Sequence, residues 1–158
     1  LRILAGLSQA LEGDIFWGQQ SIQKDSESYR QNLLFLGHKE AVKEDLTAYE
    51  NLQLSAALDH VDLSEEEALM ALHRFGLRGR EDLPVRFLSA GQKRRVLLAR
   101  LLTRKAKLWI LDEPFNALDI KAVEMLSGLI ADHVGNSGMV IMTSHQTISI
   151  PHGKVLEL

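Results

Sequence analysis

The chain contains no cysteine among its 158 residues, which excludes disulfide bonds and thiolate metal sites and agrees with a reducing compartment. Long hydrophobic runs are also absent, since no apolar stretch approaches the roughly 20 residues that span a bilayer. No secretory signal is present. The formal net charge is only -3, so no strong field drives the chain toward nucleic acid or anionic lipid. Any membrane role would therefore act through a partner.

What is present fits a folded globular domain. Hydrophobic residues make up 46% of the chain and charged residues 25%, and 158 residues suffice for one domain with its own core. The sequence opens at Leu1 in LRILAGL, without methionine and already in an apolar, helix-like pattern. We expect an opening helix that ends near Gly6, in a fragment that lacks its N-terminal part.

The first 37 residues predict two short strands joined by a surface connection. GDIFWG (13–18) is typical of a short strand between glycine turns. The stretch QQSIQKDSESYRQ (19–31) is too hydrophilic for a core and is expected on the surface. NLLFLG (32–37) is a short continuous apolar run, which predicts a buried strand stopped by Gly37.

The apolar spacing becomes helical between about residues 46 and 76, where Ser64 and Glu67 form a capping box that marks a helix start. The remainder predicts alternating elements: a helix at 88–105, a strand at 108–114, a helix at 120–134, a strand at 138–145 and a last strand at 153–158. Strands that alternate with helices indicate an α/β domain with a largely parallel sheet. The helical block at about 38–92 would be a subdomain beside that sheet.

Polar side chains follow two of the expected strands. Asp112 and Glu113 end the apolar run of LWILDEP, and His145 follows GMVIMTS. Ligands bind beyond the carboxyl ends of strands in parallel α/β sheets, so this shared placement favours a functional site over an ordinary turn. An Asp at this place can hold Mg²⁺ and the next carboxylate can activate an attacking water. An imidazole nearby can donate a hydrogen bond to a transferring phosphate.

The turn LSAGQ (88–92) is a further candidate. Ser89 can cap the helix that follows, while Ala90 and Gly91 leave the backbone open to close approach. The N–H groups and partial positive charge of a helix N-terminus suit a phosphate. Taken alone, the turn is better explained as an ordinary helix cap. The acids at the strand end, taken alone, are better explained as part of an ordinary turn. Their joint occurrence favours a phosphate site.

Together these motifs resemble the ATP-binding subunits of ABC transporters. LSAGQ matches the family's signature, Leu108–Asp112 its Walker B strand and NALD (116–119) its D-loop, in the family's order and with its spacing from signature to Walker B. The resemblance covers essentially the whole chain. It implies an α/β fold like that of P-loop NTPases (RecA-like), with a mainly parallel sheet core and a helical ABC subdomain.

The resemblance also implies roles for individual residues. Glu113 matches the catalytic glutamate, His145 the switch histidine and Asp112 the acid that holds the metal, all serving the subunit's own nucleotide. The signature would serve the ATP of a partner subunit in a sandwich dimer. The nucleotide-contacting positions implied are Ser89, Ala90, Gly91, Gln92, Asp119 and His38. The implied cofactors are ATP and Mg²⁺.

Two features depart from the family pattern. No Gly-x4-Gly-Lys-Ser/Thr P-loop occurs, so we expect residues 1–158 to be an ABC nucleotide-binding domain that lacks its N-terminal P-loop portion. Such a fragment should bind ATP negligibly and expose apolar sheet surface. His38 stands where most transporter ATPases have Gln. An imidazole can still contact water or a metal but titrates near neutral pH, and a plain loop residue is the alternative.

The segments QNLLFLGHKEAVKEDLTAYENL (31–52) and LPVRFLSAGQKRRVLLARLLTRKAKLWILDEPFNALD (83–119) resemble more narrowly the ATP-binding subunits of the haem exporter in cytochrome c biogenesis. This implies a peripheral protein on the cytoplasmic face of a bacterial inner membrane. Its partners would be a second copy of itself and integral haem-handling subunits. ATP hydrolysis would support haem export, or the loading or release of a haem chaperone.

Two alternatives remain open. One is the ATPase subunit of another ABC transporter with a different cargo. The other is a ribosome- or nucleic-acid-associated ABC protein, whose basic surface would have to come from Lys93, Arg94 and Arg95 with Arg104 and Lys105. We expect those residues to form a solvated or intersubunit face, and no nucleic-acid partner. Such relatives generally join two ATPase domains through a charged linker, which this chain lacks.

Overall fold

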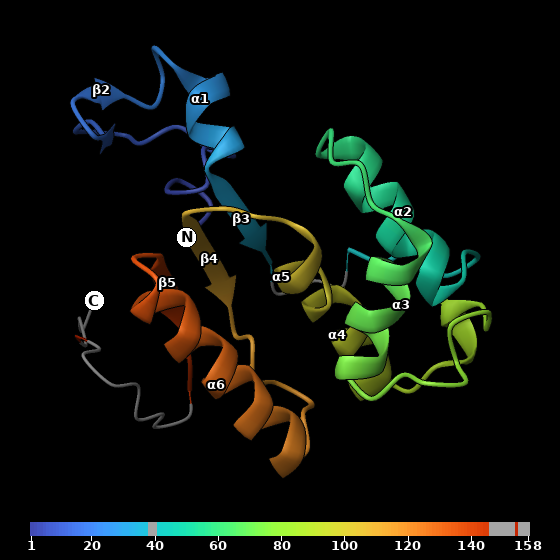
Figure 1. Cartoon of the computed structure of the whole chain (residues 1–158). Helices are drawn as coiled ribbons and strands as arrows, with labels where there is room; N and C mark the ends of the chain where they lie inside the picture. Colours follow the sequence, from blue (N-terminus) through green and yellow to red (C-terminus); the bar gives the residue numbers. More distant parts are fainter. Residues whose placement is uncertain (38–40, 146–153, 155–158) are drawn as a thin grey trace.

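Three parallel strands position the site in the computed structural model of the chain, which describes residues 1–37, 41–145 and 154 (Figure 1). They are β3 (Leu33–Leu36), β4 (Leu108–Asp112) and β5 (Met139–Thr143), in the spatial order β3-β4-β5. β4 therefore pairs on both sides, and its register sets Asp112 beside Thr143. The predicted α/β class and parallel sheet are confirmed.

β4 is buried on both faces because its residues alternate between two cores. Trp109 and Leu111 pack with the helices on one face, while Leu108 and Ile110 pack with the first 35 residues on the other. Apolar residues at successive positions are typical of a central parallel strand. The buried strand therefore fixes the position of Asp112, its last residue.

Helices gather beside the sheet, at the right of Figure 1. They are α2 (Ala48–Leu58), α3 (Glu65–Arg74), α4 (Ala90–Leu98) and α5 (Arg100–Thr103), with the 3₁₀ turn η1 (Val85–Phe87) before α4. α2, α3 and α4 each begin with a reciprocal capping box, in which cap and third-residue side chains bond each other's backbone N–H. The pairs are Thr47 with Glu50, Ser64 with Glu67 and Ser89 with Gln92. The prediction for Ser64 is confirmed.

α6 (Ile120–Gly135) leads the chain from the carboxyl end of β4 back to the start of β5. Asp119 caps its N-terminus, because a carboxylate oxygen accepts the Ala122 N–H at 2.9 Å. Near the other end, His133 stacks on Trp109 with ring centroids 3.8 Å apart and ring planes at 4°. The helix thus connects the two edges of the sheet.

The first seven residues differ from the predicted opening helix. They form turns, closed by a hydrogen bond from Leu7 N to Arg2 O at 2.9 Å, and Gly6 has a φ of +69°. Glycine adopts this left-handed conformation readily, so a short apolar run ends there before a regular helix is built. The prediction of a helix that ends near Gly6 was therefore wrong.

The stretch 19–31 was predicted as a surface connection, and most of it is exposed, but it is more than a connection. It contains β2 (Gln20–Ser21), which pairs with β1 (Phe16–Trp17), and α1 (Ser26–Gln31). Ile22 and Tyr29 are buried, and the Tyr29 hydroxyl donates to Leu4 O at 2.6 Å. Two apolar side chains are thus enough to fix a polar segment to the second core.

The helix predicted at 88–105 is divided at Ala99 into α4 and α5. Leu102 N donates to Ala99 O at 3.0 Å, a bond of the tighter 3₁₀ type. His38 and the last predicted strand, 153–158, lie outside the described residues apart from Lys154. None of the helices described is both long and apolar enough to cross a bilayer.

Candidate functional site

The carboxyl ends of β4 and β5 bring the predicted acids and histidine together. Thr143, opposite Asp112, donates its hydroxyl to Asp112 Oδ1 at 2.8 Å. The same hydroxyl oxygen accepts the Glu113 N–H at 3.2 Å. Thr143 therefore fixes both acids, a role that was not predicted from the sequence. The register of the two strands is the signal that identifies it.

Glu113 is 7% exposed although its side chain is acidic. Its Oε2 accepts the His145 main-chain N–H at 3.2 Å, and its Oε1 lies 3.5 Å from His145 Nε2. The imidazole itself is 91% exposed and can meet a ligand from solvent. A buried carboxylate held in one orientation beside an accessible imidazole can position a water and accept its proton.

The backbone at Glu113 is in the left-handed region, with a φ of +49°, and Ala117 further along the loop has a φ of +61°. Residues that carry a Cβ adopt this conformation rarely, and they do so where surrounding contacts enforce it. Both residues lie in the segment that carries the predicted catalytic acid and D-loop. The loop is therefore held in shape by its neighbours.

Ser89, Ala90, Gly91 and Gln92 lie together at the start of α4, as predicted. Ser89 Oγ accepts the Gln92 N–H at 3.3 Å, and Gln92 Oε1 accepts the Ser89 N–H at 2.9 Å. A Cβ on Gly91 would lie 2.7 Å from Ala117 O, closer than real Cβ contacts allow. Glycine is thus required here because α4 rests directly on the loop after β4.

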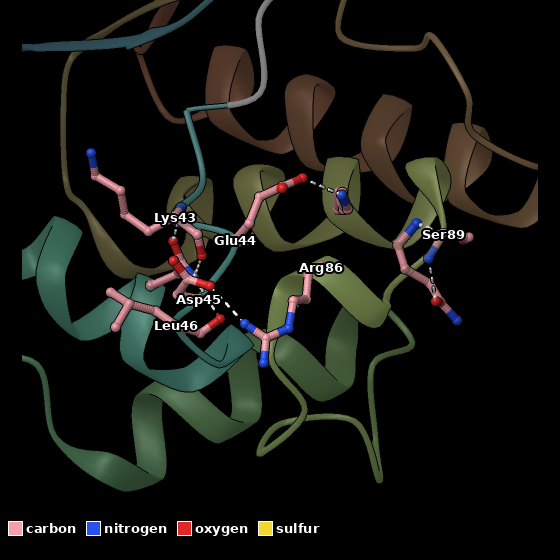
Figure 2. A network of polar contacts seen from close by, with 9 residues as sticks. Lys43, Glu44, Asp45, Leu46, Arg86 and Ser89 are labelled. Atoms are coloured by element: carbon pink, nitrogen blue, oxygen red, sulfur yellow. Dashed lines mark hydrogen bonds and ion pairs between the residues drawn. The ribbon is translucent and has the colours of Figure 1, made fainter.

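A polar network ties this helix start to residues 43–46 (Figure 2). Lys93 Nζ donates to Glu44 Oε1 at 2.6 Å, and Arg86 Nη1 donates to Asp45 Oδ1 at 2.6 Å. The Arg86 N–H also donates to Glu44 O at 3.0 Å. The segment on the C-terminal side of residue 40 and the entry to α4 therefore form one connected unit.

The basic run was predicted to be a solvated or intersubunit face, and this was wrong for Arg94. Arg94 is 4% exposed, and its guanidinium donates to three main-chain carbonyl oxygens. Its neighbour Arg95 bonds Asp119 Oδ2 at 2.5 Å, and Arg104 pairs with Asp59. Local sequence does not reveal these contacts, because every acceptor is distant along the chain.

Asp119 lies at the end of the predicted D-loop, where it caps α6. The Ala122 N–H and, after it, the Arg95 guanidinium hold the pKa of the Asp119 carboxyl below its usual value. Both contacts favour the charged form. The side chain is thus occupied within the subunit, and its contact with nucleotide stays a prediction.

The chemistry of the donors fits a nucleotide-bound Mg²⁺. This ion takes oxygen ligands and is commonly held by one or two carboxylates together with phosphate oxygens and water. Asp112 supplies one such carboxylate at the strand end, already oriented by Thr143. Within residues 1–37, 41–145 and 154, no three His, Cys, Asp or Glu side chains gather into a metal cage. The Asp112 carboxylate is therefore the described group that fits Mg²⁺ at this strand end.

Comparison with known proteins gives relatives over the full chain. A family profile described as ABC transporter matches residues 1–116. The cytochrome c biogenesis ATP-binding export protein CcmA of Dechloromonas aromatica (strain RCB) is 51% identical over 158 residues, covering 100% of this chain and 78% of the relative. The protein of the same name from Haemophilus influenzae is 48% identical, covering 100% of this chain and 74% of that protein.

Solved structures agree in fold. An ATP-binding subunit of an ABC transporter superposes with a TM-score of 0.76 at 25% identity, covering 91% of this chain and 61% of that one. A dimeric ATP-binding cassette in a post-hydrolysis state with ADP and Pi gives 0.78 at 24% identity, covering 92% and 68%. The predicted fold of P-loop NTPases is confirmed. The chain belongs to the ABC transporter family of ATP-binding proteins.

Proposed function

We propose that this protein is the ATP-binding, ATP-hydrolysing subunit of an ABC transporter for haem export, or for haem-chaperone loading or release, in c-type cytochrome biogenesis. The identity of 51% with a cytochrome c biogenesis export protein, over all 158 residues, supports this cargo. The hydrolytic part rests on one observation: the buried Glu113 carboxylate held against His145 at the carboxyl edge of the sheet.

Asp112, Glu113 and His145 would act on the nucleotide of their own subunit. Asp112, oriented by Thr143, would hold Mg²⁺, which neutralises charge on the phosphates when bound. Glu113 would orient the attacking water and accept its proton. His145 would donate a hydrogen bond from its exposed imidazole to the transferring phosphoryl group.

A second copy of the subunit would complete each site. The helix start at Ser89, Ala90 and Gly91 would face the partner's phosphates, with Gln92 and Asp119 beside it. The dimeric state of a solved cassette with the same fold supports this assembly. His38 lies outside the described residues, and its contact with nucleotide or water remains part of the proposal.

Residues 1–158 would form a nucleotide-binding domain without its P-loop portion, with the helical subdomain at about 38–92. The subunit would sit on the cytoplasmic face of a bacterial inner membrane and bind integral haem-handling subunits. We propose no nucleic-acid partner, because three of the basic side chains in question are paired with carboxylates inside the subunit. The pairs are Lys93 with Glu44, Arg95 with Asp119, and Arg104 with Asp59.

The substitution Glu113→Gln in the full-length subunit tests the hydrolytic role. Turnover of ATP should fall by about 10²–10⁴-fold, because the amide keeps the shape of the side chain and loses the base. ATP binding, measured by equilibrium dialysis, should persist. Glu124→Gln is the matched control, since Glu124 is an exposed glutamate on α6. Turnover near wild type in Glu113→Gln would remove Glu113 from the mechanism.

The cargo is tested by complementation of a bacterial strain that lacks its own subunit. Wild-type protein should restore covalent haem attachment to periplasmic c-type cytochromes, and Glu113→Gln should not. Restored ATP hydrolysis in membranes without restored haem attachment would mean that the subunit drives a different cargo. Haem staining of the separated periplasmic proteins distinguishes these outcomes.

A further inference from the structure

The guanidinium of Arg94 joins the signature helix to the ends of two strands. Its Nη2 donates to Asp112 O at 2.9 Å and to Glu113 O at 2.8 Å, and its Nη1 donates to Gly37 O at 3.2 Å. Gly37 follows β3, Asp112 ends β4, and Glu113 comes directly after it. A single side chain on α4 thus holds the main chain where both strands leave the sheet.

These bonds act on the peptide that sets the direction of the Glu113 side chain. Glu113 has a φ of +49°, a conformation that L-residues with side chains avoid unless their surroundings enforce it. Thr143 holds its N–H and Arg94 holds its C=O, so the residue is fixed on both sides. Loss of either contact allows the backbone to relax and the carboxylate to move.

An arginine is particularly suited to this position. Its planar guanidinium offers several N–H donors in a fixed fork, so two of its nitrogens bond carbonyls of two strand ends at once. A lysine keeps the positive charge but has a single nitrogen on a flexible stem. Replacement of Arg94 by lysine therefore tests the geometry separately from the charge.

We infer that Arg94 is a positioning residue for ATP hydrolysis, which couples the placement of α4 to the orientation of the Glu113 carboxylate. The inference rests on the proposed function, in which α4 serves the partner's nucleotide and Glu113 its own. Through its bonds to Asp112 O and Glu113 O, Arg94 makes the backbone at Glu113 move when α4 moves. Contact between Gly91 and the Ala117 carbonyl adds a second point of support from the same helix.

The experiment compares Arg94→Lys, Arg94→Met and Glu113→Gln, singly and combined, in the full-length subunit with its membrane partners. Arg94→Lys should lower kcat about 10- to 100-fold, since misplacement of a catalytic group by about 1 Å costs that much. The KM for ATP should change little, and the fall in kcat should exceed any loss of folded protein that a melting curve shows. Arg78→Lys is the control, because Arg78 is exposed and lies outside both the helix start and the loop after β4.

The combined variant separates positioning from a general structural role. In the Glu113→Gln background, Arg94→Lys should change the residual turnover less than about twofold, since residues that act as a unit are not additive. An equal fractional loss in both backgrounds, or a fall in kcat that only follows loss of folded protein, would overturn the inference. So would a kcat within about twofold of wild type in both Arg94 variants.

Failure of the proposed function would look different. In that case Glu113→Gln itself retains turnover, whatever the Arg94 variants do. If Glu113→Gln abolishes turnover while Arg94→Lys and Arg94→Met do not, the proposed function stands and Arg94 is not a positioning residue. Arg94→Met removes the charge as well, and a melting curve shows whether it folds.

Discussion

The two edges of the same sheet are built in different ways. At the amino edge, Ser137 adopts a φ of +65° just after the C-cap of α6, a place where helices commonly end in the left-handed conformation. At the carboxyl edge, Glu113 and Ala117 adopt the same conformation in a loop. No helix end explains these two, and contacts from α4 and Thr143 hold them instead.

The difference shows which edge depends on several elements at once. The amino edge is stabilised by a ring stack between His133 and Trp109 and by hydrogen bonds close to it, such as Met139 N to Lys107 O at 2.8 Å. The carboxyl edge forms only when α4, β5 and the loop after β4 are all in their places. We therefore expect substitutions at the carboxyl edge to affect both stability and turnover, and those at the amino edge to affect stability alone.

The largest effect is expected for Gly91→Ala at the carboxyl edge. The new Cβ would lie 2.7 Å from Ala117 O, so α4 or the loop must shift. We expect a loss of roughly 1–3 kcal/mol in the free energy of unfolding, measured in urea, together with reduced turnover.

Gly128→Ala is the matched control for this substitution. A Cβ on Gly128 meets no atom within 4 Å, and the residue lies inside α6. The same chemical change should there raise stability by roughly 0.5–1 kcal/mol. Equal losses in the two variants would show that close packing at Ala117 is not the cause.

Thr143→Val is expected to have the next largest effect. Valine keeps the shape of the side chain but removes the hydroxyl that bonds Asp112 Oδ1 and Glu113 N. Stability should fall by about 1–2 kcal/mol and turnover about 10-fold or more, since both acids lose a fixed partner. In the control Thr103→Val, the lost bond to Arg100 O is long, at 3.4 Å. Wild-type turnover in Thr143→Val would show that the acids are held without it.

The smallest effect is expected at the amino edge, from the protonation of His133. Burial lowers the pKa of its imidazole, and hydrogen bonds with the main chain of Lys107 and Met139 oppose this in part. The unfolded chain therefore binds the proton more strongly. The stability contribution is present above the unfolded pKa of about 6.5 and is lost as pH falls through it toward the folded pKa.

Unfolding curves between pH 5 and about 8 measure this dependence. His133→Phe should weaken it and keep a ring stacked on Trp109, while the exposed His60, replaced by Asn, should leave it unchanged. ATP turnover relative to the folded fraction should be equal in the three proteins. A change in turnover in His133→Phe alone would contradict the separation of the two edges.

Local patterns in the sequence predicted the elements and the place of the acids. The four residues 108–111 are apolar without a break, which indicates a strand buried on both faces, and the carboxylate of Asp112 that follows them must reach the sheet edge. Ser64 and Glu67 predicted a helix start because both partners lie within one turn. Such signals are complete within a few neighbouring residues.

The contacts that hold the site were beyond local patterns. Arg94 was predicted to lie on a basic surface. Its acceptors are main-chain carbonyls, which no residue type marks in the sequence, and one of them, Gly37 O, is 57 residues away. Thr143 lies opposite Asp112 only once the register of β4 and β5 is fixed. Ile22 and Tyr29 were likewise assigned to the surface, since the core that receives them joins the start of the chain to β3 and β4. The position of each of these side chains is set by contacts with residues far away in the sequence.

The three capping boxes differ in charge. α2 starts with Glu50 in its box and α3 with Glu67, so a negative side chain lies against the positive end of each helix dipole. α4 uses the neutral amide of Gln92, and its first turn holds no acidic residue. Its cap therefore satisfies backbone donors without cancelling the local positive potential. An anion that approaches α4 meets an attractive field, whereas at α2 and α3 the protein's own carboxylates already offset it.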